Sequence, residues 1–188
     1  MEAADHPRAS AVAASADDVR SAFRELHGPR LHGFALLLTL GDRRRAALLA
    51  GDAIARAGHD LSELRHPERA AAWLRGQVVR MAASDDRDLT VADRLAALAD
   101  LGITPPALAG LSGLSRIERA GLIATAVERL DTRDVATVVG RDGDRLDALL
   151  RRARQRYLRG ATAALGEIGG PPGPIGRRVG ASAARTMA

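Results

Sequence analysis

The sequence predicts an all-α protein made of two small helical domains joined by a flexible linker. Hydrophobic residues make up 46% of the 188 residues but aromatic residues only 2%, so a core must consist mainly of alanine, leucine and valine. Alanine and leucine favour helices, whereas strands favour β-branched and aromatic residues. Apolar residues also recur at the three- and four-residue spacing of amphipathic helices along most of the chain.

Composition excludes several classes of chemistry. All 28 basic residues are arginine, and cysteine is absent. Lysine Schiff bases, the lysine of a phosphate-binding P-loop, disulfides and thiolate zinc sites are therefore excluded. No long apolar run or signal-like N-terminus is present, which predicts a cytoplasmic protein without membrane contact. The formal net charge of +5 mildly favours an anionic partner such as nucleic acid.

The first domain is predicted to be a helical bundle over residues 15–83, preceded by a disordered leader at residues 1–14. The leader is rich in alanine and has no periodicity. Ser15 resembles the start of a capping box for the first helix, which Gly28 and Pro29 are expected to end.

Three further helices complete this predicted bundle. The second covers residues 30–40, the third covers residues 42–57, and the fourth begins at Pro67, where a first helical turn accepts proline. Trp73 is the only tryptophan and is expected to anchor the core.

Residues 84–106 are predicted to form the linker. They begin with the polar sequence SDDRD, continue as a further helical segment over residues 91–101, and end in Pro105 and Pro106, which are expected to break any helix. Ser115, followed three residues later by Glu118, then resembles a capping box for the next helix.

A helix-turn-helix is predicted within the second domain, residues 107–159. Val135 and Val139 mark one face of a short helix, Ala136 is small enough for close helix crossing, and Gly140 supplies the unusual backbone angle of the turn. In such a unit the second helix enters the DNA major groove and the first crosses the backbone.

The second helix ends in a run of arginines that predicts contact with phosphate. Cations also suit a helix C-terminus, so a structural role stays open. Acids at the start of the same helix could accept hydrogen bonds from cytosine amino groups or could simply suit the helix N-terminus. The acids are Asp142, Asp144 and Asp147, and the arginines are Arg151, Arg152, Arg154, Arg156 and Arg159. The Gly- and Pro-rich residues 160–188 are predicted to be a flexible tail.

Two stretches in each half carry a family resemblance. LSRIERAGLIATAVERLDTRDVATVVG and LLRRARQRYL resemble the promoter-binding domain of the extracytoplasmic-function sigma factors of the sigma-70 family. FRELHGPRLHGFALLLTLGD and PERAAAWLRGQVVRMA more faintly resemble the other conserved domain of that family. The resemblance implies a domain 2-like bundle and a winged-helix-like domain 4. Its implied partners are bacterial RNA polymerase core, promoter double-stranded DNA and an anti-sigma factor.

The resemblance also implies which residues bind each partner. Arg145 and Leu149 would face bases. In the third helix the family carries an acidic, glutamine-containing surface that binds polymerase, and here the corresponding residues are Leu48, Asp52 and Arg56. The remaining residues expected to bind DNA are Arg141, Arg151, Arg152, Arg154 and Arg156.

No pattern predicts an enzyme, a cofactor or a metal site. The five histidines lack the four-residue spacing of a metal site, and no HExxH, catalytic serine motif or GxGxxG after a strand is present. The sequence therefore favours a sigma-like transcription initiation protein. The alternative is a diverged sigma-like regulator that acts mainly through protein–protein interaction, favoured by SDDRD, the three aspartates and the altered third helix. A stand-alone helix-turn-helix repressor is a third, weaker possibility.

Overall fold

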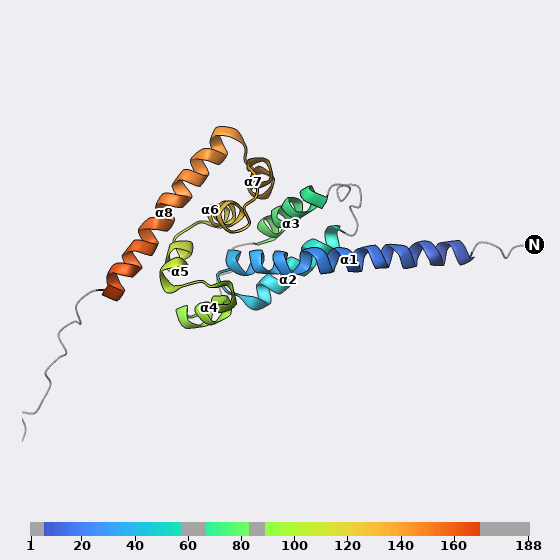
Figure 1. Cartoon of the computed structure of the whole chain (residues 1–188), viewed down its shortest axis with the longest axis horizontal. Helices are drawn as coiled ribbons and strands as arrows, with labels where there is room; N and C mark the ends of the chain where they lie inside the picture. The colour runs from blue at the N-terminus through green and yellow to red at the C-terminus, as the bar shows by residue number, and fades with distance from the viewer. Residues whose placement is uncertain (1–5, 58–66, 83–88, 170–188) are drawn as a thin grey trace, which may run out of the picture.

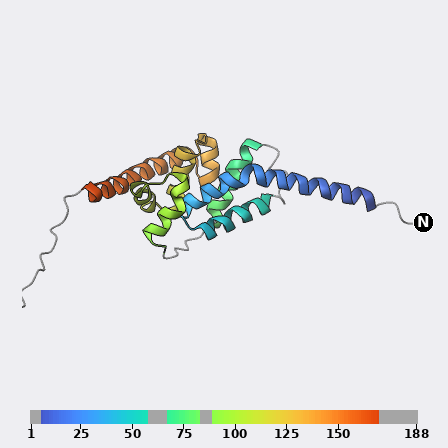
Figure 2. The same cartoon turned by 60° about the horizontal axis from the view of Figure 1, so that its bottom comes forward.

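The computed structural model describes residues 6–57, 67–82 and 89–169 of the chain. All regular structure within these ranges is helical, which confirms the all-α prediction. Helix α1 (His6–Leu38) and helix α8 (Gly143–Gly169) point away from the centre on opposite sides, and the shorter helices lie between them (Figure 1). Figure 2 shows the same arrangement after a 60° turn.

Helix α1 is continuous where two helices were predicted. Pro29 lies inside it, although proline removes one hydrogen bond and crowds the preceding turn. Packing of α1 against α2 (Arg43–Ala57) and α3 (Pro67–Met81) compensates, with Leu31 and Phe34 fully buried. The helix already begins at His6, inside the predicted leader. Ser15 therefore lies within α1, and the predicted capping box at its position is wrong.

Helices α2 and α3 confirm the third and fourth helices predicted from the sequence. Asp42 caps α2, because its Oδ1 accepts a hydrogen bond of 2.8 Å from the backbone N–H of Arg45. Trp73 of α3 is partly buried and packs against the core, where Leu74 and Val78 are fully buried. The prediction that Trp73 packs against the core is thus confirmed, although its side chain is only partly buried.

The segment predicted as a linker contains helix α4 (Val91–Leu98) and the 3-10 turn η2 (Ala99–Leu101), which confirm the helical segment predicted over residues 91–101. Helix α5 (Pro105–Ser112) begins at its end. SDDRD lies outside the described residues. Thr104 caps α5 by accepting from the Ala107 N–H, and Pro105 and Pro106 occupy its first turn. The two prolines were expected to break a helix. They begin one instead, because a first-turn residue needs no intrahelical N–H partner.

The C-terminal half consists of α6 (Arg116–Leu122), the π-helical turn η3 (Ile123–Val127), α7 (Thr132–Val139) and α8. The predicted capping box of Ser115 and Glu118 is confirmed at the start of α6. Helix α8 packs along α5 and α6. At the α5–α8 crossing Gly110 lies so close to Tyr157 that a Cβ on Gly110 would be 2.7 Å from the ring.

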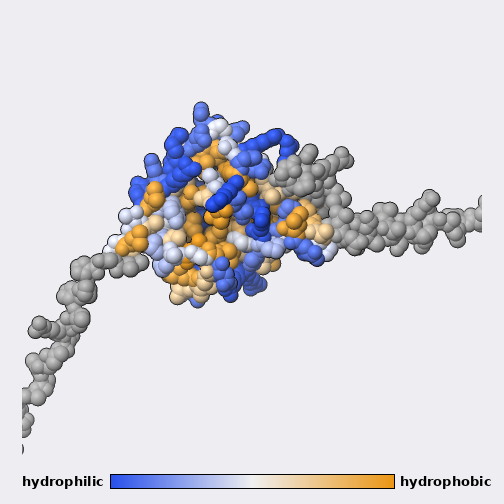
Figure 3. Space-filling model, viewed as in Figure 1, coloured by the Kyte–Doolittle hydropathy of each residue, from blue (hydrophilic) through white to orange (hydrophobic). Residues whose placement is uncertain are grey.

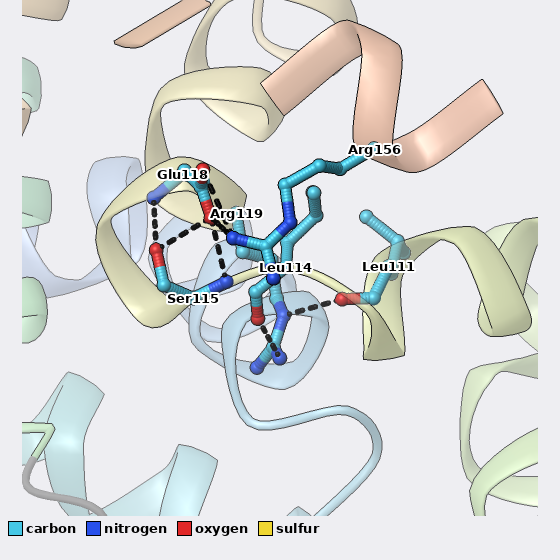
Figure 4. Close-up of polar contacts among 6 residues, drawn as sticks. All are labelled: Leu111, Leu114, Ser115, Glu118, Arg119 and Arg156. Carbon is cyan, nitrogen blue, oxygen red and sulfur yellow. Dashed lines mark hydrogen bonds and ion pairs between the residues drawn. The ribbon is translucent and has the colours of Figure 1, made fainter. Parts of the chain in front are cut away.

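Arginine side chains join several helix ends to other elements. Arg119 donates to the carbonyls of Leu111 (3.1 Å) and Leu114 (3.0 Å), as Figure 4 shows, and to that of Leu38 at the end of α1 (2.6 Å). Arg116 likewise donates to the carbonyl of Ala82, just after α3. Carbonyls at helix C-termini lack a full set of intrahelical partners, and these arginines donate to carbonyls at or near the ends of α1, α3 and α5, so part of the positive charge serves the fold.

The two halves of the chain share one hydrophobic core, to which residues of both contribute. Helix α3 packs against α7, and a Cβ on Gly76 would lie 3.1 Å from the carbonyl oxygen of Thr137. Arg75, whose side chain is only 4% exposed, forms an ion pair of 2.6 Å with Glu128. Buried ion pairs are costly to break from one side, so this contact holds the halves in one arrangement.

Candidate nucleic-acid interface

Helices α7 and α8 are joined by a short turn whose shape depends on glycine. Gly140 ends α7 in the left-handed conformation, with φ 66° and ψ 35°, which confirms the unusual backbone angle predicted there. The backbone N–H groups of Gly140 and Arg141 both donate to the carbonyl of Ala136, at 2.9 and 3.2 Å. Asp131 caps the start of α7 through a hydrogen bond of 2.8 Å from the Asp134 N–H. The two helices are therefore held at a defined angle to each other.

The inner face of α8 carries Leu146, Leu149 and Ala153, all buried. Leu149 is only 4% exposed, and its Cδ2 would lie 3.1 Å from a Cβ placed on Gly121 of α6. The expectation that Leu149 faces bases is therefore wrong in this structure. The helical period places Leu149 one turn after Leu146 on the core side, where it packs against α6.

Five of the predicted DNA-binding arginines are exposed in the turn and along α8. In the part of the chain that the structure describes, these five side chains make no hydrogen bond or ion pair. Hydrophilic side chains accordingly line the edge of the molecule where α8 lies (Figure 3). The five are Arg141, Arg145, Arg151, Arg152 and Arg154.

Arg156 is arranged differently from the other predicted DNA-binding arginines. Its Nη1 lies 3.0 Å from Oε2 of Glu118 in α6, and Figure 4 shows the side chain reaching from α8 to that carboxylate. Burial alone would raise the pKa of Glu118, but the hydrogen bonds from Ser115 and the charge of Arg156 outweigh it and hold that pKa below its ordinary value. Since Glu118 neutralises Arg156 internally, Arg156 does not join the group of free arginines.

The acids at the start of α8 are also free. Asp142, Asp144 and Asp147 are exposed, and their side chains make no hydrogen bond within the described residues. The starts of α2, α4, α5, α6 and α7 differ, because each has a side chain that accepts a capping hydrogen bond. These capping residues are Asp42, Thr90, Thr104, Ser115 and Asp131. Hydrogen-bonded capping therefore does not account for the three acids of α8, although a favourable helix-dipole interaction remains.

The three residues predicted to contact polymerase lie on one exposed stripe of α2. Leu48, Asp52 and Arg56 follow each other at four-residue spacing, opposite the buried alanines of the same helix. Leu48 is 53% exposed. The structure thus brings these three residues together on a surface open to a partner.

The chain matches no protein-family model, and no curated protein matches it significantly. The described residues contain no group of three or more side chains that could hold a metal ion. No single described helix is long and apolar enough to cross a membrane, and only the bent pair Val91–Leu101 and Pro105–Ser112 reaches the required length and composition. The geometry of the exposed surfaces is therefore the basis for a functional proposal.

Proposed function

We propose that this protein is a sigma-like transcription initiation factor. It binds promoter DNA through α7, the glycine turn and α8, and it directs bacterial RNA polymerase core to that DNA. The observation that supports this best is the group of five free arginines on a two-helix unit with a left-handed glycine between the helices. Such a unit suits the major groove, with its second helix in the groove.

The proposed contribution of this chain is to position polymerase core on promoter DNA, with no covalent bond made or broken. Free guanidinium groups form charge-assisted hydrogen bonds with phosphate oxygens, and each neutralised phosphate releases condensed counterions. Arg141, Arg152 and Arg154 are the proposed phosphate contacts, together with Arg145 beside the first turn of α8. The buried side chains Leu146 and Leu149 hold this surface rigidly against α6.

Polymerase core is proposed to dock on the exposed stripe of α2. Leu48 offers an apolar centre, with Asp52 and Arg56 as polar neighbours. An interface of this composition fits a protein partner, because interface centres are apolar and their rims polar. The same stripe supports the second candidate, a regulator that acts through protein contacts alone.

The salt dependence of DNA affinity separates these two candidates. The full chain is titrated into a labelled mixed-sequence duplex at several salt concentrations, and the dissociation constant is measured by fluorescence anisotropy. With four phosphate contacts, the logarithm of the association constant should fall against the logarithm of salt with a slope of roughly −3 to −4. A flat salt dependence would remove the DNA contact from the proposal and favour the regulator.

A further inference from the structure

The outward face of α8 carries a stripe of side chains with distinct hydrogen-bonding chemistry. Asp144, Ala148, Arg151 and Gln155 are spaced by four, three and four residues, so they lie on one side of the helix. Leu146 and the other buried residues of α8 occupy the opposite side. Asp144, Arg151 and Gln155 are exposed and Ala148 is half-buried.

Two observations leave the side chain of Asp144 available to a ligand. Its carboxylate is exposed in the first turn of α8 and makes no hydrogen bond within the described residues. It also stands on the same stripe as Arg151, which is equally free. Phosphate repels a carboxylate. On a DNA-binding surface, a carboxylate is therefore least unfavourable where it accepts a hydrogen bond from a donor group of the DNA.

The major groove offers such donors and the matching acceptors. A carboxylate accepts from the N4 amino group of cytosine, and an arginine donates two hydrogen bonds to O6 and N7 of guanine. A small residue between them lets the helix approach the bases closely. Asp144 and Arg151 are seven residues apart, which at about 1.5 Å per residue corresponds to roughly three base pairs of about 3.4 Å.

We infer that Asp144 and Arg151 determine the DNA sequence that this protein prefers, by contacting a cytosine and a guanine about three base pairs apart. The inference rests on the proposed function, since it assigns bases to the same surface. It replaces Leu149, which is buried, as a base contact. Arg145 lies to one side of the stripe and remains a phosphate contact.

Selection from a randomised duplex library tests this assignment. The full chain is incubated with the library, bound duplexes are recovered and sequenced, and the same is done for Asp144→Ala and Arg151→Ala. The full chain should enrich G·C pairs at two positions about three base pairs apart. Asp144→Ala should reduce the preference at one position about 10-fold, and Arg151→Ala should reduce the preference at the other.

Glu167→Ala is the matched control, because it removes the same charge from the same helix at its far end, more than twenty residues from Asp144. It should leave the enriched sequence unchanged. The inference is overturned if Asp144→Ala keeps the wild-type preference, or if Glu167→Ala changes it equally. If the wild-type chain recovers no duplex at low salt, the proposed function itself fails. Unchanged thermal unfolding midpoints show that the variants are folded.

Discussion

Replacement of Arg151, Arg152 and Arg154 together by alanine should weaken binding to duplex DNA by on the order of 10²-fold at moderate salt. These three side chains are exposed and free, so the substitutions remove contacts with the ligand and leave the internal packing of α8 intact. The dissociation constant is measured by anisotropy with a labelled duplex. Circular dichroism checks that the helix content of the variant equals that of the wild type.

The matched control removes three arginines from elsewhere. Arg24 and Arg30 of α1 and Arg44 of α2 are exposed, and their joint replacement by alanine lowers the net charge by the same amount. This control should lose far less affinity, because only general attraction to DNA is reduced. Equal losses in both triple variants would mean that net charge, and not the surface of α8, is responsible for binding.

Replacement of Gly110 by alanine should lower the free energy of unfolding by about 1–3 kcal/mol. A Cβ at this position would lie 2.7 Å from the Tyr157 ring and 2.9 Å from the Tyr157 carbonyl oxygen, so α5 and α8 would have to separate. This crossing supports the helix that carries the proposed DNA contacts. Urea denaturation followed by circular dichroism measures the change.

Gly166→Ala is the control for this prediction. Gly166 also lies in a helix, but an added Cβ meets no atom within 4 Å. Its replacement should raise the free energy of unfolding by about 0.5–1 kcal/mol, because alanine favours the helix. If Gly110→Ala were as stable as the wild type, the close crossing of α5 and α8 would be contradicted.

Local signals in the sequence predicted much of the fold. The left-handed turn at Gly140 and the capping box of Ser115 and Glu118 each depend on residues within one turn, and both are confirmed. Pro29 shows the limit of such signals. Its intrinsic cost to a helix is offset by packing against α2 and α3, which are distant in sequence.

In the candidate site too, features that depend on neighbouring residues were predictable, and features that depend on distant residues were not. The arginines of α8 were visible in the sequence, but the ion pair of Arg156 with Glu118 joins residues 38 positions apart. Burial of Leu149 could have been found from the helical period, since Leu146, Leu149 and Ala153 mark one face. The family resemblance instead assigned Leu149 to the bases, whereas it packs against α6.

The most direct test of a sigma-like role is competition for bacterial RNA polymerase core. The full chain is titrated against a labelled active sigma factor of the same small class bound to core, and displacement is followed by anisotropy. We expect displacement, weakened by Leu48→Asp on α2 and unchanged by Leu165→Asp, which alters a leucine of similar exposure on α8 (58% against 53%). Failure of the wild-type chain to displace the sigma factor at saturating concentration would contradict the account.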